Sequence, residues 1–178
     1  MLNRDRLVKS SRIVVRIASL ANRFLLLAFV VLLLLSWIFS PQFAAWLAQS
    51  TPERDVLSKM TGMRWEILLG IAMSLATDRL FAALAQVIAS ASAGDPFILT
   101  NARRLQTIGW ALLALQLLDF PAALLGRFYP SLGSAAPSGT VTIGPFSVGG
   151  WISVLMVFVL SRVFAAGSEM REELEGTV

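Results

Sequence analysis

The sequence predicts an all-α membrane protein with four transmembrane helices arranged as two antiparallel hairpins. A basic N-terminal surface helix precedes them, and a short cytoplasmic C-terminal helix follows. Hydrophobic residues make up 56% of the 178 residues and charged residues only 15%, and the mean hydropathy is +0.72. Soluble domains average roughly 45–50% apolar and 25% charged residues, so a chain this short cannot hide the excess in a water-facing core. The apolar residues fall into four long segments, which indicates a single integral membrane domain over residues 1–178.

The N-terminal residues 1–19 are basic and precede the first of these apolar segments. Lys9, Arg12, Arg16 and Arg23 fall along one face of a helix, which favours a helix lying on anionic lipid, each base contributing about 1 kcal/mol. Basic helices also bind nucleic acid. Here the bases adjoin a membrane anchor and no aromatic residues are interleaved, so we expect the lipid bilayer as partner and no direct contact with nucleic acid.

The first span is predicted at about residues 20–40 and contains the uncharged run "FLLLAFVVLLLLSWIF". Arg23 would extend toward the headgroups at one end, and Trp37 would lie near the other interface. The alternative is a cleaved signal peptide. The apolar run is longer than the core of a signal peptide, and "AAWLAQ" is a poor cleavage site, so we predict an uncleaved anchor.

Three further spans are predicted at about residues 65–93, 105–126 and 146–166. The second contains Asp78 and Arg79, the third contains Asp119 and Pro121, and Arg162 lies near the end of the fourth. The apolar residues before Asp78 are too few to cross a bilayer. These charges therefore lie at membrane depth, where each costs roughly 2.5–3.5 kcal/mol on insertion scales.

Asp78, Arg79 and Asp119 form a candidate set of intramembrane polar residues. Arg79 could snorkel inward, or it could meet Asp119 or Gln116 of the antiparallel third span, and Asp78 could stay protonated. A proton, ion or ligand pathway is the functional interpretation. The structural alternatives are a polar clamp, or a second helix whose last turns protrude into the cytoplasm. An amphipathic stripe that includes Leu80, Leu84 and Ala91 favours the protruding helix.

The segment "GDPFILTNARRLQTIGW" between the second and third spans predicts a tight turn. Gly94 can end a helix in the left-handed conformation, and Asp95 is pushed out of the helical region by Pro96. A simple joint between helices explains these residues. An exposed Phe97 favours the alternative, a docking loop for a cytoplasmic partner.

The beginning of the third helix follows this turn directly. Thr100 or Asn101 is expected to cap it, and Arg103 and Arg104 are expected to anchor its entry at the headgroups. Asn101, Arg103 and Arg104 are therefore further candidates for the cytoplasmic docking surface.

The last residues, 167–178, form an acidic tail with four Glu and one Arg. Met170 and Leu174 are four residues apart and give a short helix one apolar edge, flanked by acidic residues such as Glu173. Such an edge could bind a basic, partly apolar surface. The alternative is a solvated tail that only helps to set the topology.

The turn "GDPFILTNARRLQTIGW" and the ending "VFVLSRVFAAGSEMREELEGTV" together resemble the small bacterial four-span membrane proteins of domain-of-unknown-function family 2975 (DUF2975). The resemblance covers the chain from about Trp65 onward. The matching positions are Gly94, Phe97, Asn101, Arg104, Leu105, Ile108, Gly109, Phe164, Gly167, Glu173, Leu174, Thr177 and Val178.

The resemblance implies no established activity. Its members are often encoded beside a small helix-turn-helix regulator, which implies, by association alone, a regulatory or sensory membrane partner of a cytoplasmic transcription regulator. The alternative is a small transporter or an accessory subunit of a larger membrane complex. A homo-oligomer is compatible with either function.

Catalysis is not expected. The chain has no Cys and no His, which removes thiol chemistry, the commonest general base and the commonest metal ligand. No carboxylates cluster at the spacing of metal ligands within a span. We therefore expect a protein that is not an enzyme and holds neither a cofactor nor a metal.

The distribution of Lys and Arg predicts the orientation. With four spans, ten of the fifteen bases lie on the side of the termini and the middle turn, four lie on the other side, and Arg79 lies within a span. Because bases are enriched in cytoplasmic loops, both termini are expected in the cytoplasm. With the family resemblance, this predicts a multi-pass protein of the bacterial inner membrane.

This topology can be tested by labelling single cysteines introduced into the cysteine-free chain. Ser50→Cys and Ser138→Cys lie in the loops expected outside, at residues 41–64 and 127–145, and should react with a membrane-impermeant maleimide in intact cells. Ser10→Cys should react only after the membrane is opened. The opposite pattern would invert the predicted orientation.

Overall fold

The computed structural model describes residues 2–49, 53–93, 97–128 and 147–175, with the side chains of 10–49, 55–93, 97–127 and 147–173. All of its regular structure is helical. The helices are α1 (Leu2–Ile38), α2 (Ser40–Ala48), α3 (Glu53–Ser92), α4 (Leu99–Phe128) and α5 (Val148–Glu175). Four of them contain segments long and apolar enough to cross a membrane: Ser10–Ile38, Asp55–Ser92, Leu99–Arg127 and Val148–Glu173. The predicted class, an all-α protein with four candidate spans, is confirmed.

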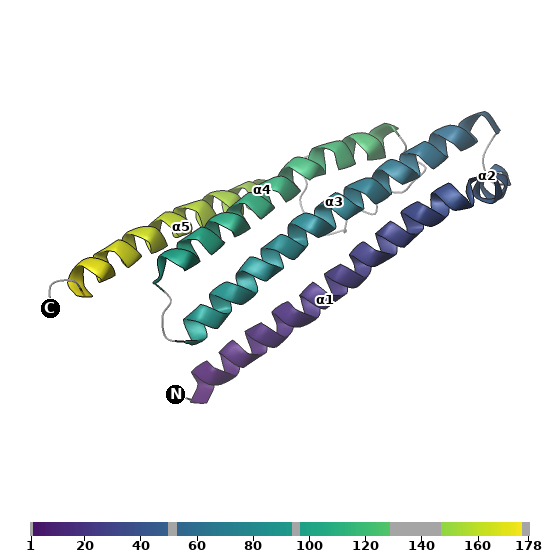
Figure 1. Ribbon diagram of the computed structural model, residues 1–178. Helices are drawn as coiled ribbons and strands as arrows, with labels where there is room; N and C mark the ends of the chain where they lie inside the picture. Colours follow the sequence, from purple (N-terminus) through teal and green to yellow (C-terminus); the bar gives the residue numbers. More distant parts are fainter. Residues whose placement is uncertain (1, 50–52, 94–96, 129–146, 176–178) are drawn as a thin grey trace.

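The four long helices lie side by side in a single row in the order α1, α3, α4, α5 (Figure 1). In the described residues, α1 contacts α3 but neither α4 nor α5, and α5 contacts only α4. Neighbouring helices are antiparallel. Between α1 and α3, Arg12 contacts Ser92 whereas Ser36 contacts Arg64. The contacts between α3 and α4 and those between α4 and α5 likewise pair later residues of one helix with earlier residues of the next. The row is continuous, so α3 and α4 are packed neighbours and the chain does not divide into two separate hairpins.

The two ends of the row differ. The start of α1, the end of α3, the start of α4 and the end of α5 lie at one end of the row, called here the termini end (Figure 1). The end of α1, the short α2, the start of α3 and the end of α4 lie at the far end. Arg104 and Arg127 of α4 mark these ends. At about 1.5 Å per residue they are about 35 Å apart, slightly more than the thickness of a bilayer's hydrocarbon core.

Small residues let the helices approach one another closely. The ring of Phe29 in α1 lies against Gly70 of α3, where a Cβ atom would come within 2.8 Å of Phe29 Cε2. The ring of Phe158 in α5 lies against Gly109 of α4, where a Cβ atom would come within 3.1 Å of Phe158 Cε1. Close packing on small residues is the usual basis of helix association in membranes, where hydrophobicity alone does not draw helices together.

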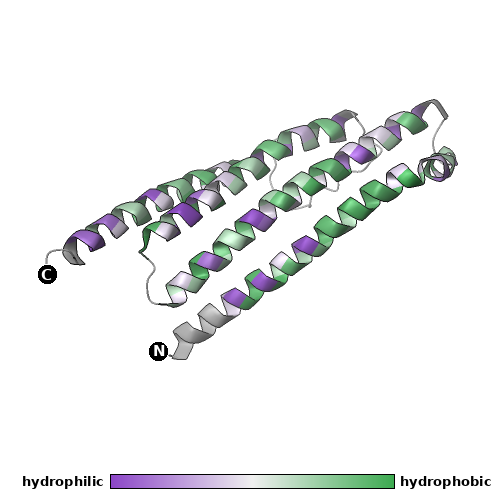
Figure 2. Cartoon of the chain, viewed as in Figure 1, coloured by the Kyte–Doolittle hydropathy of each residue, from purple (hydrophilic) through white to green (hydrophobic). Residues whose placement is uncertain are grey.

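One apolar cluster joins the three helices α3, α4 and α5 in the half of the row nearer the termini end. Ala83 of α3 and Leu105 and Ile108 of α4 are buried at its centre, and Val157 and Phe164 of α5 pack against it. The remaining apolar side chains of the row point mostly outward, and hydrophobic residues dominate the middle of the helices in Figure 2. An exposed apolar surface of this extent fits a bilayer as the solvent.

The predicted N-terminal surface helix and the predicted short cytoplasmic C-terminal helix are instead parts of longer helices. The basic segment 1–19 was expected to lie separately on the membrane, but α1 continues without interruption from Leu2 to Ile38. This stretch contains neither Gly nor Pro to break it. Likewise, the C-terminal segment continues α5 through Gly167 to Glu175.

The region 41–64, expected as an external loop, is largely helical. The short helix α2 begins with Pro41 in its first turn, where a proline costs no hydrogen bond, and it is seen nearly along its axis in Figure 1. Leu47 of α2 is buried against Val56 and Met60 of α3. The early turns of α3 therefore have an apolar partner at the far end. The loop expected at 127–145 lies outside the described residues from 129 onward.

The close approach of α4 and α5 can be tested at Gly109. Gly109→Leu should lower the free energy of unfolding by about 1–3 kcal/mol, because the new side chain must displace the Phe158 ring. Gly149→Leu is the matched control, since no atom lies within 4 Å of a Cβ at Gly149, and it should change stability little. Thermal unfolding in detergent measures both, and equal effects would contradict the packing.

Candidate functional site

The polar side chains at the termini end form a hydrogen-bonded joint between α3 and α4. Asn101 has no exposed surface, and its Oδ1 accepts hydrogen bonds from Ser90 Oγ at 2.7 Å and from Arg104 Nη1 at 2.9 Å. Asn101 was considered as a cap of α4. The helix instead begins at Leu99, and the side-chain amide oxygen of Asn101 accepts a hydrogen bond from Ser90 of α3.

The two arginines that follow Asn101 point in different directions. Arg104 turns toward α3, where its Nε donates to Gln86 Oε1 at 3.0 Å and its Nη1 donates to the Gln86 carbonyl oxygen at 3.3 Å. Arg103 is exposed and lies instead beside α5, with Arg162. Adjacent helical residues point about 100° apart, which explains the divergence. Arg104 is therefore part of the joint, whereas Arg103 is open to the surroundings.

Phe97 connects the turn to α5. Its ring packs on Phe164 with centroids 5.0 Å apart, and it lies against Gly167, where a Cβ would come within 3.2 Å of Phe97 Cδ1. Phe97 is nevertheless 46% exposed. It acts as a packing residue between α5 and the turn and also contributes to the surface of the termini end.

The positions that carry the family resemblance therefore meet in space. The joint contains Asn101 and Arg104, and the contact with α5 contains Phe97 and Gly167. Others lie in the apolar cluster or against its neighbours: Leu105, Ile108, Gly109 and Phe164. These residues pack three helices together, which is a structural role. Gly94, Asp95 and Pro96 lie outside the described residues.

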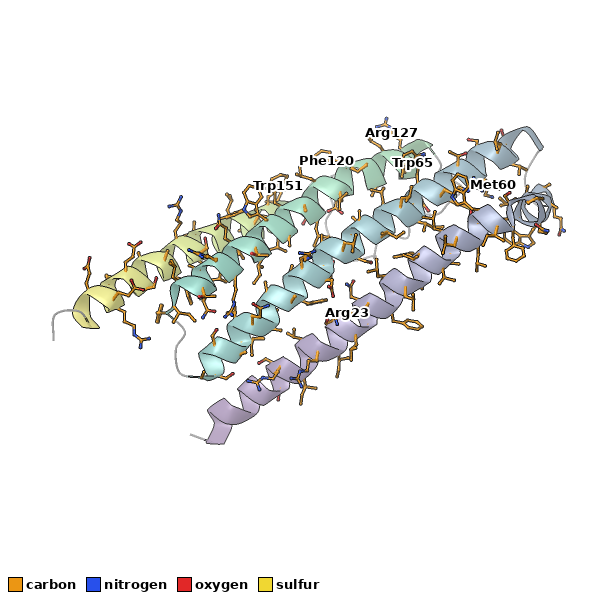
Figure 3. The ribbon with its side chains drawn as sticks, in the orientation of Figure 1. Arg23, Met60, Trp65, Phe120, Arg127 and Trp151 are labelled. Atoms are coloured by element: carbon orange, nitrogen blue, oxygen red, sulfur yellow. The ribbon has the colours of Figure 1, made fainter. Side chains whose placement is uncertain are left out.

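Asp78 forms an ion pair that the sequence analysis did not predict. Arg23 Nε of α1 lies 2.9 Å from Asp78 Oδ1 of α3, and Figure 3 shows Arg23 on the helix beside α3. The arginine is 60% exposed and the carboxylate 28%. Asp78 lies eight residues further into α3 than Gln86, so the pair is about 12 Å inside the level of Arg104.

Arg79 and Asp119, the pair expected from the sequence, are not brought together. The contacts of Gln86 with Arg104 and of Ser90 with Asn101 set the register of α3 against α4. In this register Arg79 lies near the level of Ala111. Asp119 is therefore about eight residues, or about 12 Å, farther along the row. The exposed side chain of Arg79 and the half-buried carboxyl of Asp119 occupy different levels.

The acidic tail residues lie on the last turns of α5 at the termini end (Figure 1). Met170 is 60% exposed, and Glu169, Glu172 and Glu173 are also exposed. The side chain of Leu174 lies outside the described part. Among the described residues, no three Asp or Glu side chains come close enough to hold a metal ion.

The sequence profile of a family described as proteins of unknown function (DUF2975) matches residues 21–178. The chain belongs to this family. The match starts within α1 and therefore reaches further than the resemblance seen from Trp65 onward, while the basic segment 1–19 lies outside it. No curated protein and no solved structure matches the chain.

The ion pair between Arg23 and Asp78 can be tested with a double-mutant cycle. Arg23→Gln and Asp78→Asn should each destabilise the protein, because each leaves one charge without its partner. The double variant should lose less stability than the sum of the two single losses. We expect a coupling of about 1 kcal/mol or more, measured by unfolding in detergent. The control cycle, Arg79→Gln with Asp119→Asn, should be additive within about 0.5 kcal/mol. Coupling in the control cycle alone would favour the sequence-based pair instead.

Proposed function

We propose that this protein is a regulatory or sensory membrane protein that acts by binding, without catalysis, and that it holds a basic cytoplasmic partner such as a helix-turn-helix regulator. In this proposal the protein spans the bacterial inner membrane, and the termini end faces the cytoplasm. The excess of Lys and Arg at that end supports the orientation.

One observation carries the proposal: apolar side chains are exposed at the termini end of the row. Phe97 and Leu99 precede Arg103 in the chain and are 46% and 42% exposed. Met170 follows Gly167, against which Phe97 packs, by less than one helical turn. With Arg103 at the lipid headgroups, lipid tails would not cover side chains that lie beyond it. An exposed apolar patch rimmed by polar residues is typical of a protein-binding surface.

The charges around this patch favour a basic partner. Glu169, Glu172 and Glu173 are exposed on the same turns of α5 as Met170. Complementary charge accelerates association and selects among partners. A DNA-binding protein presents a basic surface, so an acidic, partly apolar patch could bind it in competition with DNA.

A second candidate function is an accessory subunit of a larger membrane complex, or a homo-oligomer. The single row of helices favours it, because both faces of the row are open. Arg23, at membrane depth, keeps 60% of its side chain exposed. A neighbouring protein chain could cover that charge at lower cost than lipid.

The tail provides the test. Deleting residues 169–178 should abolish capture of the cytoplasmic partner during affinity purification from gently solubilised membranes, because it removes Met170 and the acidic residues around it. Membrane insertion and helical content should not change beyond the missing residues. Deleting residues 2–8, at the same end of the row, is the control and should leave capture intact.

Capture of the same partner by the tail-deleted protein at the same salt concentration would contradict recognition by the tail. Recovery of a stable assembly of membrane proteins, with no cytoplasmic partner, would support the second candidate instead.

A further inference from the structure

A groove of about 590 Å³ lies between α4 and α5 near the termini end. Arg103 and Gln106 of α4 line it, together with Ser161 and Arg162 of α5. Its apolar lining includes Phe158 and Val159. It is separate from the polar joint, in which Arg104 bonds to α3.

The two arginines of the groove have no acidic partner. Among the described residues, neither Arg103 nor Arg162 donates a side-chain hydrogen bond or forms an ion pair, whereas Arg104 bonds to three residues of the joint. No Asp or Glu stands three or four positions from either arginine on its own helix. The lining contains no carboxylate. The groove therefore presents two positive charges whose donors are available to an anion.

The level of the groove matches the lipid headgroups. Arg103 lies about 36 Å along α4 from Arg127, and Figure 3 shows Arg127 at the far end of the row. The hydrocarbon core is about 30 Å thick. When Arg127 is placed at one interface, Arg103 therefore reaches the headgroups of the opposite leaflet.

An apolar surface continues from the groove toward the middle of the row. Val159 lines both the groove and a second hollow of about 640 Å³ on α5, which is bordered by Leu155, Leu160 and Val163. The two hollows together present a charged compartment at the headgroup level and an apolar one on the hydrocarbon side. This is the division of polarity within a phospholipid.

We infer that the groove between α4 and α5 binds an anionic phospholipid of the leaflet at the termini end. Its phosphate is held by Arg103 and Arg162, and an acyl chain lies along Phe158 and Val159. Basic pockets between transmembrane helices suit such headgroups, because guanidinium forks match phosphate oxygens and the anion neutralises the pocket. This site is independent of the partner binding proposed above and would remain if that proposal failed.

The experiment uses the full chain, purified in detergent and stripped of lipid. Native mass spectrometry counts bound lipid during titration with phosphatidylglycerol and, separately, with phosphatidylcholine of the same acyl chains. The first phosphatidylglycerol should bind at least about tenfold more tightly than phosphatidylcholine, a difference of about 1.4 kcal/mol. Inorganic phosphate at millimolar concentration should not displace it, because free phosphate lacks the acyl chain.

Paired variants locate the site. Arg103→Gln with Arg162→Gln should reduce the preference for phosphatidylglycerol by about tenfold. Arg12→Gln with Arg16→Gln removes the same charge from α1 at the same end and should change it by less than about threefold. Arg103→Lys with Arg162→Lys keeps the charge without the planar fork and should retain part of the preference.

A fluorescence measurement leaves both arginines of the groove unaltered. Trp110 lies edge-on to Phe158, with ring centroids 5.5 Å apart, so phosphatidylglycerol with brominated chains should quench its fluorescence more than brominated phosphatidylcholine. The Trp110→Phe protein serves to subtract the other tryptophans. Equal quenching by the two lipids, equal losses in the two Gln pairs, or displacement by phosphate alone would overturn the inference.

Discussion

Asn101 is the largest side chain in the described structure with no exposed surface, and the hydrogen bond that it accepts from α3 helps to set the register on which the termini half of the row depends. A buried amide without partners costs about 1–3 kcal/mol, so α3 and α4 are held where Ser90 of α3 reaches Asn101 Oδ1. A sliding of α4 by one turn would break this bond and the bond from Arg104 to Gln86. It would also move Leu105 and Ile108 away from Ala83 of the apolar cluster.

The joint also determines what remains available for binding. Because Arg104 is used inside it, the surface of the termini end presents Arg103 beside α5 and the apolar residues around Phe97. These two surfaces adjoin at Leu99, which lines the groove and is also one of the exposed apolar residues of the patch. A lipid site and a protein-binding patch can exist together, and both depend on the placement of α5 by Phe97 and Gly167.

Much of the fold could be predicted from the sequence. Length and hydropathy were enough to predict four spans, and four helices of the structure contain segments long and apolar enough to cross a membrane. The ends of the helices were less predictable, since the basic segment 1–19 was interpreted as a surface helix and the acidic tail as a separate short cytoplasmic helix. The basic segment has neither Gly nor Pro, and α5 continues through Gly167. Amphipathic patterning alone cannot tell whether a helix turns onto the membrane or continues straight. The short α2 was missed because nine residues carry too weak a pattern.

The candidate residues were identified more reliably than their contacts. The apolar run before Asp78 and Arg79 is too short to cross a bilayer, so sequence alone predicted that these charges lie at membrane depth. Only the tertiary structure decided that Arg23 of α1 pairs with Asp78, and that Asp119 lies about 12 Å from the level of Arg79. Hydropathy tells how costly it is to place each residue in the bilayer, and it can be read from the sequence alone. The partner that offsets the cost of a charged residue depends on the order and register of the helices. These arise from packing between helices that are far apart in the sequence.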